Sequence, residues 1–226
     1  MFDKRYEIVL ADTEESKKIH FNLRYQVYCL EKGFEEAESF TDKLERDDYD
    51  KKAVHFLIRC RNSKRWVGTF RLVIDNFDNL PIHHHSAIYP EHFKNSSRLV
   101  SEFSRLAVLR TFQSLPGKPR QDEEHNECAI LMRAIYAGVE YSRQEGLNEI
   151  TFFCRRSLGH IVSKLGFVKQ QIGSGSMYRG MRYPYRVELG NFPTRTFDTA
   201  EAIQRFHTHN AYRRYSDIYR VHHMAA

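Results

Sequence analysis

Hydrophobic and polar residues recur along the chain with periods that predict alternating strands and helices. A short apolar run at Tyr6–Leu10 predicts a first strand. We expect the following helix to start at a capping box formed by Asp12 and Glu15 and to end at Gly33. Four apolar residues mark the buried side of that helix: Ile19, Leu23, Val27 and Leu30.

The rest of the chain continues the same alternation. Residues 53–60 and 66–75 predict a hairpin, residues 101–108 a further strand, and residues 126–145 a helix that Gly146 ends. A strand at 149–154, a short helix capped by Ser157 and strands at 167–173 and 185–189 follow. A last capping box, Asp198 with Glu201, predicts a basic helix over residues 198–222.

Two of the predicted strands carry charges among apolar residues. In SEFSRLAVLR, residues 101–110, strict alternation puts Glu102 and Ser104 on one face and Arg105 on the other. Arg71 interrupts the strand at 66–75 in the same way. Because both faces of these strands are mostly apolar, an unpaired charge there would be expensive to desolvate. The pattern therefore predicts either structural salt bridges or a polar functional site.

Composition narrows the class of protein. The chain has 226 residues, of which 41% are hydrophobic, and this suits a single domain over residues 1–226. No apolar run is long enough for a membrane helix and the first residues do not resemble a signal peptide, so we expect a cytoplasmic protein. The cysteines are too scattered to predict a disulfide framework or a zinc site. A net charge of +6 allows nucleic acid, an acidic membrane or an acidic protein as partner.

Several motifs resemble one family. The predicted order of elements and the stretch GHIVSKLGF at 159–167 are similar to the GNAT acyltransferase fold. RYQVY at 24–28, ERDDYD at 45–50, VGTFRLV at 67–73 and EFSRLAV at 102–108 resemble acyl-homoserine lactone synthases in order and spacing. N-acyl amino acid synthases and the acyltransferases of PEP-CTERM/exosortase systems share this pattern. The resemblance implies an α/β, GNAT-like acyl-CoA N-acyltransferase fold, with a central mixed twisted sheet flanked by helices.

The resemblance also implies roles for particular residues. Residues 1–52 would form a helix and an acidic lid over a core of residues 53–190. Glu102 is the candidate general base, with a purely structural salt bridge as the alternative. A β-bulge is implied near Arg105, and it would relax the strict alternation of that strand. The residues expected to bind substrate or organise the site are Arg24, Tyr28, Phe34, Asp47, Asp50, Arg71, Ser104 and Arg105. In such a fold Arg24, Arg71 and Arg105 would meet Asp47, Asp50 and Glu102 around a cleft, which gives these buried charges their partners.

Departures from the family pattern bear on the substrates. Phe34 and Tyr28 differ from the aromatic residues usual in lactone synthases, which leaves the acceptor open. Val162 stands where many GNAT enzymes have a tyrosine that protonates the leaving thiolate. No glycine-rich RxxGxG motif precedes the helix at 126–145, so an acyl-phosphopantetheine thioester on acyl carrier protein is favoured over coenzyme A. We expect no tightly bound cofactor. We also expect no metal, since the consecutive residues His83, His84 and His85 are poorly placed to share one ion.

An acidic carrier protein would suit the basic balance of the chain better than nucleic acid. The residues expected to dock it are Lys118, Arg120, Arg155, Arg156 and Lys164. The basic C-terminal helix would cap the acyl tunnel, dock the carrier or touch membrane lipid, and the sequence does not rank these roles.

We therefore predict an N-acyltransferase that moves a fatty acyl chain from acyl carrier protein to the amine of a small acceptor, an amino acid. The alternatives are an acyl-homoserine lactone synthase that uses S-adenosylmethionine and a non-catalytic module that binds acyl carrier protein.

Overall fold

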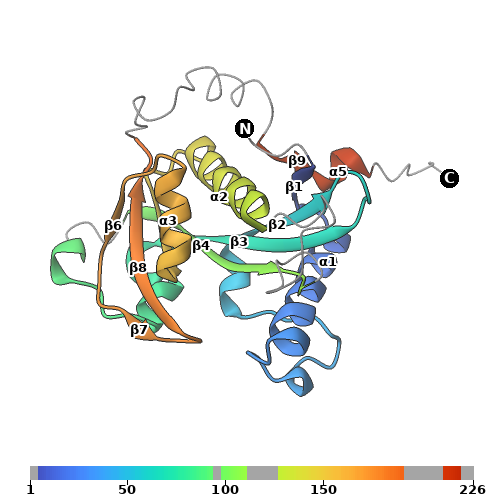
Figure 1. Cartoon of the computed structure of the whole chain (residues 1–226), viewed down its shortest axis with the longest axis horizontal. Coiled ribbons are helices and arrows are strands. Elements are labelled where there is room, and N and C mark those ends of the chain that lie inside the picture. Colours follow the sequence, from blue (N-terminus) through green and yellow to red (C-terminus); the bar gives the residue numbers. More distant parts are fainter. Residues whose placement is uncertain (1–4, 94–97, 111–126, 191–210, 220–226) are drawn as a thin grey trace, which may run out of the picture.

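The computed structural model describes residues 5–93, 98–110, 127–190 and 211–219. In these residues nine strands form one mixed sheet in the order β6-β8-β5-β4-β3-β2-β1-β9, with β7 paired to β8 (Figure 1). The strands are β1 Tyr6–Leu10, β2 Ala53–Cys60, β3 Trp66–Asn76, β4 Leu99–Val108, β5 Glu149–Cys154, β6 Lys169–Gln171, β7 Ser176–Met177, β8 Met181–Glu188 and β9 Arg213–Arg214. The helices are α1 Glu14–Tyr25, α2 Glu127–Gln144, α3 Arg156–Lys164 and α5 Tyr215–Ile218, and a π-helical turn, η1 Gln26–Glu31, continues α1.

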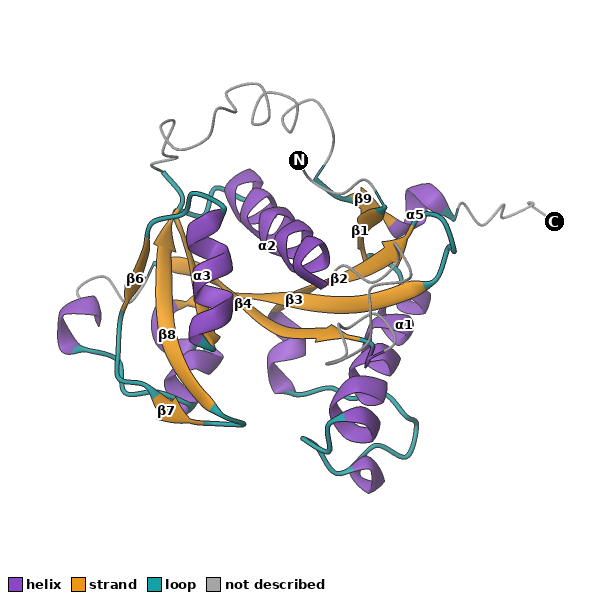
Figure 2. Cartoon of the chain, in the orientation of Figure 1, coloured by secondary structure: helices purple, strands orange, loops and turns teal. Residues whose placement is uncertain are grey.

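Helices lie on both faces of the sheet (Figure 2). On one face α2 and α3 cover the largest apolar cluster, in which Phe103 of β4 packs with Phe70 of β3 and Phe152 of β5. Gly138 of α2 allows this close packing, since a Cβ there would lie 2.9 Å from the Phe103 ring. On the other face α1 packs against β1 and β2 through Leu23, Val9 and Leu57. The predicted mixed sheet flanked by helices is confirmed.

Short 3-10 turns complete this second face. They are η2 Ala37–Ser39, η3 Asp48–Lys52, η4 Phe77–Asn79, η5 Pro81–His84 and η6 Pro90–Phe93. Phe77, Leu80 and Ile82 from η4, η5 and the residue between them bury their side chains beside Val73 of β3. The acidic segment around η3 and the turn η5 therefore both lie over the face of the sheet opposite α2.

The register between β3 and β4 shifts between Thr69 and Arg71, because Thr69 pairs with Ala107 while Arg71 pairs with Ser104. One extra residue of β4 must fit opposite Phe70, and Arg105 adopts a left-handed φ of 51° there. This is the expected β-bulge, and such an insertion reverses the faces of all later residues. Strict alternation had put Arg105 on the opposite face from Glu102; that prediction is wrong, since Arg105 and Glu102 both face the acidic segment.

Two helix boundaries differ from prediction. The N-cap of α1 is Thr13, in a reciprocal capping box with Ser16, instead of Asp12 with Glu15. The cap of α3 is Arg155, without a side-chain hydrogen bond, instead of Ser157. The first error arises because Asp12 and Thr13, at neighbouring positions, give the same sequence signal. The second arises because α3 begins at Arg156, one residue before the residue expected to cap it.

The C-terminal prediction is also wrong in the part that the structure describes. Residues 211–219 contain the short strand β9, which pairs in parallel with β1, and the single helical turn α5, instead of one continuous helix. Tyr215 buries its ring next to Val9, so this segment packs on the sheet. The start of the predicted helix, with Asp198, Glu201 and Arg205, lies outside the described residues, as does Arg220.

Candidate active site

A cavity of about 350 Å³ opens where β4 and β5 separate. The two parallel strands pair only from Ser101 to Phe103 of β4, although β4 continues to Val108 and β5 to Cys154. Beyond this point both strands line the cavity, together with residues of α2, α3 and the lid side. Residues from both faces of the sheet thus line the cavity.

Glu102 lies at the inner end of this cavity. Its side chain is buried, and one carboxylate oxygen accepts a 2.8 Å hydrogen bond from the backbone N–H of Ile82. In the described residues no cation lies within ion-pair distance of this carboxylate, so Glu102 is outside the salt-bridge network that we expected it to join. Burial raises the Glu102 pKa to about 7, although the Ile82 N–H and the charges of Arg71 and Arg105 oppose the shift. A carboxyl group with this pKa can accept a proton near neutral pH.

A dense ion-pair network fixes the acidic segment against the sheet beside Glu102. Arg24 of α1 bonds to Asp50 at 2.6 Å, and Arg71 of β3 bonds to Asp47 at 2.5 Å and to Asp50 at 2.7 Å. Burial disfavours the charge on Asp50, but Arg24 and Arg71 outweigh it and hold its pKa well below the usual range. Burial acts on Asp47 in the same way, and Arg71 and Arg105 lower its pKa. The predicted pairing of these arginines and aspartates is confirmed.

Local sequence explains why these aspartates lie together. Asp47 caps the turn η3 by accepting a hydrogen bond from the Tyr49 N–H, and the Asp50 carboxylate accepts one from the Asp47 N–H. This capping box holds two carboxylates three residues apart on one turn. Glu45 of the same segment is also buried, and it pairs with Arg24 and Arg105. Sequence reasoning missed Glu45, although it begins the acidic stretch ERDDYD.

Arg105, turned by the bulge, joins the network from β4. Its guanidinium lies 2.9 Å from Asp47 and 3.6 Å from Glu35. Tyr28 donates a 2.9 Å hydrogen bond to the carbonyl of Leu106, next to the bulge. Phe34 stacks on Tyr28 with their ring centroids 6.3 Å apart, and both line the cavity. Ser104 accepts a 3.1 Å hydrogen bond from Arg71, so all the residues expected to organise the site lie together.

The residues expected to dock a carrier protein are only partly described. Arg155 and Arg156 are exposed at the start of α3, and Arg155 lines the cavity mouth. Lys164 is exposed at the other end of α3. Lys118 and Arg120 lie outside the described residues. Val162 of α3, which stands where many GNAT enzymes have a tyrosine acid, is buried in the hydrophobic core.

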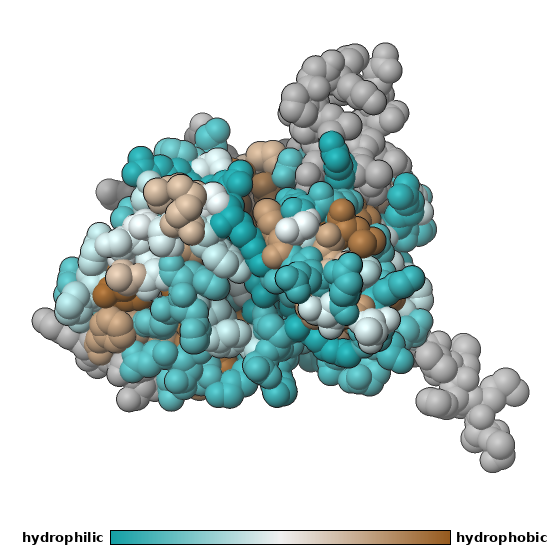
Figure 3. Space-filling model, turned by 90° about the horizontal axis from the view of Figure 1, so that it is seen from below, coloured by the Kyte–Doolittle hydropathy of each residue, from teal (hydrophilic) through white to brown (hydrophobic). Residues whose placement is uncertain are grey.

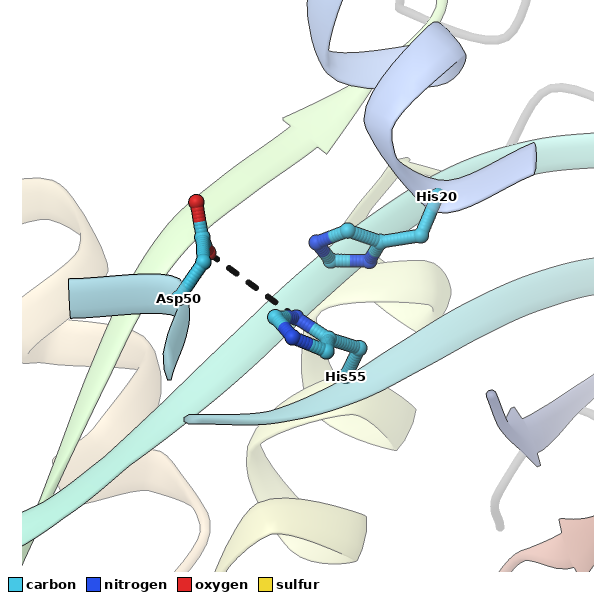
Figure 4. A group of neighbouring side chains, drawn as sticks. All are labelled: His20, Asp50 and His55. Atoms are coloured by element: carbon cyan, nitrogen blue, oxygen red, sulfur yellow. Dashed lines mark ion pairs between the residues drawn. The ribbon is translucent and has the colours of Figure 1, made fainter. Parts of the chain in front are cut away.

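One further buried cluster was not predicted: His20 of α1, His55 of β2 and Asp50 (Figure 4). Their candidate ligand atoms lie within 4.8 Å of one another. However, the Asp50 oxygen that faces His55 already accepts from Arg24 and Arg71. A metal ion would share that oxygen with two guanidinium groups, and like charges in a buried site repel strongly. The histidines therefore fit a neutral packed pair, in which burial lowers the pKa of His55 to about 4.

The surface seen in Figure 3 is mainly hydrophilic, with hydrophobic residues in small separate patches. None of the helices in the described ranges has an apolar stretch long enough to span a bilayer.

Comparison with known proteins agrees with this architecture. A family described as Acetyltransferase (GNAT) domain matches residues 23–118, which include the end of α1, the acidic segment, β2, β3 and β4. No curated protein sequence matches the chain significantly.

Solved structures share the fold over most of the chain. The AHL synthase LasI is 20% identical, with a TM-score of 0.58, and the match covers 83% of this chain and 90% of LasI. BjaI, a CoA-dependent acyl-homoserine lactone synthase solved with SAM and isopentyl-CoA, is 19% identical, with a TM-score of 0.56 and coverage of 82% and 83%. FeeM, an N-acyl amino acid synthase from uncultured soil microbes, is 15% identical, with a TM-score of 0.56 and coverage of 83% and 93%.

The domain match and the architecture show that the chain has the GNAT fold and support an acyltransferase enzyme. Within that class its fold is the one shared by acyl-homoserine lactone synthases and the N-acyl amino acid synthase.

Proposed function

We propose that the chain is an N-acyltransferase that moves a fatty acyl group from a thioester on acyl carrier protein to the amine of an amino acid. The observation that carries this proposal is the position of Glu102, a buried carboxyl group with a pKa of about 7 at the gap between β4 and β5. A purely structural glutamate would be expected to have a cationic partner, whereas in the described residues Glu102 accepts a hydrogen bond from the Ile82 N–H.

In this mechanism the thioester enters from the side of α3 and the amine from the side of the acidic segment. Glu102, directly or through one water, accepts a proton from the amine, and the nitrogen lone pair attacks the thioester carbonyl carbon. The new C–N bond forms and the C–S bond breaks, so the thiolate leaves and takes a proton from water. Backbone N–H groups at the bulge beside Arg105 are candidates to polarise the carbonyl oxygen.

The ion-pair network has a positioning role in the proposal. Asp47, Asp50 and Arg71 are fully engaged with one another, so proton transfer through them would break strong buried contacts. They hold the acidic segment over Glu102, keep water out and thereby maintain its raised pKa.

Two basic residues at the cavity mouth support acyl carrier protein as the donor. Arg155 and Arg156 present two exposed positive charges at the start of α3, where an acidic carrier would approach. BjaI, a neighbour with the same fold, is CoA-dependent, so the experiment must compare both thioesters.

The test incubates the purified chain with a decanoyl thioester of acyl carrier protein or of coenzyme A, an amino-acid mixture and S-adenosylmethionine. Mass spectrometry should detect N-decanoyl amino acids that form faster from the carrier-bound donor. A homoserine lactone product would instead indicate a lactone synthase, and absence of any acylated amine would indicate a non-catalytic module.

Two variants make the test specific to Glu102. Glu102→Gln keeps the shape and the bond from Ile82 and should lower turnover by about 10²–10⁴-fold. Glu127→Gln removes a carboxylate elsewhere on the cavity wall and should leave turnover within about threefold. Equal losses in both variants would contradict the role of Glu102 as the base.

A further inference from the structure

The cavity wall is strongly cationic, and its arginines differ in their partners. Arg71, Arg105 and Arg179 each have a carboxylate partner, the last through Glu35 at 2.6 Å. Arg155 is exposed to solvent at the mouth. Arg182 differs from all of these, because it is half-buried and no carboxylate among the described residues lies within ion-pair distance.

Burial and the charge of Arg155 lower the pKa of Arg182, and its Nε atom has no hydrogen-bond partner in the described part of the chain. Leaving a desolvated guanidinium unpaired is expensive, and a bound anion would relieve that penalty.

The place of Arg182 in the sheet indicates which substrate it meets. Tyr183, the next residue of β8, pairs with Cys154, the last residue of β5, so Arg182 lies just beyond the end of β5 at the open gap. Along β8, Tyr185 and Val187 pack into the core beneath α2 and α3. Because side chains alternate along a strand, Arg182 points to the opposite face, on which Glu102 also lies. This is the face from which the amine enters, and a donor phosphate would remain on the α3 side.

Aromatic packing holds the Arg182 side chain ready. Its guanidinium lies 5.8 Å from the ring centroid of Tyr178, and that ring stacks on His85 at 4.0 Å. Both rings line the same cavity. A guanidinium held by stacking loses little further freedom when it binds a planar carboxylate in a bidentate manner.

We propose that Arg182 binds the carboxylate of the acceptor and makes the enzyme select amino acids over simple amines. This inference rests on the proposed function and names the residue that defines its acceptor class. The carboxylate would neutralise Arg182 while Glu102 accepts the proton from the amine of the same molecule.

The test compares leucine and phenylalanine with isopentylamine and phenethylamine, which lack only the carboxylate, with the decanoyl thioester of acyl carrier protein as donor. The wild-type enzyme should acylate each amino acid at least about tenfold more efficiently than its amine. Arg182→Gln should raise the KM for the amino acids by about 10–100-fold, and leave the KM values for the amines and for the donor nearly unchanged.

Arg186→Gln is the matched control, since Arg186 lies on the same strand and face but pairs with Glu149 away from the cavity. This control should keep the preference for amino acids. A rise in the donor KM for Arg182→Gln without a change for amino acids would overturn the inference and assign Arg182 to the donor phosphate. Equal effects on amino acids and amines would also overturn it, because they indicate a general structural role.

Thermal shift by leucine separates this inference from the proposed function. Millimolar leucine should raise the Tm of the wild type and the Arg186→Gln variant but not that of Arg182→Gln, and isopentylamine should raise none of them. If no amine is acylated, the proposed function fails, while this measurement still decides whether Arg182 binds a carboxylate. Equal shifts by leucine in all three proteins would overturn the inference.

Discussion

The buried carboxyl group of Glu102 is needed as the proposed base, but its negative charge lowers the stability of the fold. Glu102→Gln should therefore reduce activity and increase stability. Burial raises the pKa of Glu102 from the ordinary 4.5 to about 7. The folded protein therefore holds this proton more tightly than the unfolded chain does. Below about pH 4.5 both states are protonated and there is no penalty. As pH rises towards 7 the unfolded chain releases the proton first, so stability is lost, and above 7 the loss is complete.

At about 1.4 kcal/mol per pH unit, the difference between 4.5 and about 7 corresponds to about 3 kcal/mol at pH 8. At pH 5 the same linkage gives less than about 1 kcal/mol. Glutamine resembles the protonated acid in shape and can still accept the Ile82 N–H bond. Glu102→Gln should therefore be more stable than the wild type by about 3 kcal/mol at pH 8, with a much smaller gain at pH 5.

Urea denaturation followed by fluorescence of the single tryptophan, Trp66, measures this difference at both pH values. In parallel, kcat/KM of the wild type should rise with pH through an apparent pKa near 7, and the variant should lose most activity throughout. A variant that is equally or less stable than the wild type at pH 8 would refute the reasoning, because the buried carboxylate would then carry no penalty.

Three further predictions concern residues around Glu102. Asp47→Asn and Arg71→Ala should each lower activity. In a double-mutant cycle, the loss of unfolding free energy in the double variant should be about 0.5–3 kcal/mol smaller than the sum of the two single losses. Additive losses would contradict their pairing. Changing Arg155 and Arg156 together to glutamate should raise the KM for the carrier-bound donor and weaken its salt dependence; an unchanged KM would move the docking surface elsewhere. Burial lowers the pKa of His55 to about 4, so the unfolded chain protonates first as pH falls below 6.5. His55→Gln should therefore reduce the loss of stability between pH 6.5 and 4 in urea denaturation, and an unchanged slope would contradict this.

The sequence by itself determined the order of elements and the need for a polar site. Period-two and helical patterns reflect burial on one face, and they predicted the order of strands and helices, whereas the resemblance to the GNAT family implied the mixed sheet. Arg71 in an apolar strand required partners because desolvated charge is costly, and Asp47 and Asp50 were the acidic residues that the motif offered. Helix caps were less certain, because adjacent polar residues such as Asp12 and Thr13 offer the same hydrogen bonds.

Only the tertiary structure decided which charges are paired and which are not. The bulge turns Arg105 to the face of Glu102, because β4 must fit one more residue than β3, and strand alternation alone cannot show this. Glu45 became part of the network through contacts with residues 21 and 60 positions away, Arg24 and Arg105. Arg182 could be singled out only once β8 was placed beside β5. In the described residues it is a half-buried arginine at the cavity with no carboxylate within ion-pair distance, and the sequence alone does not show this.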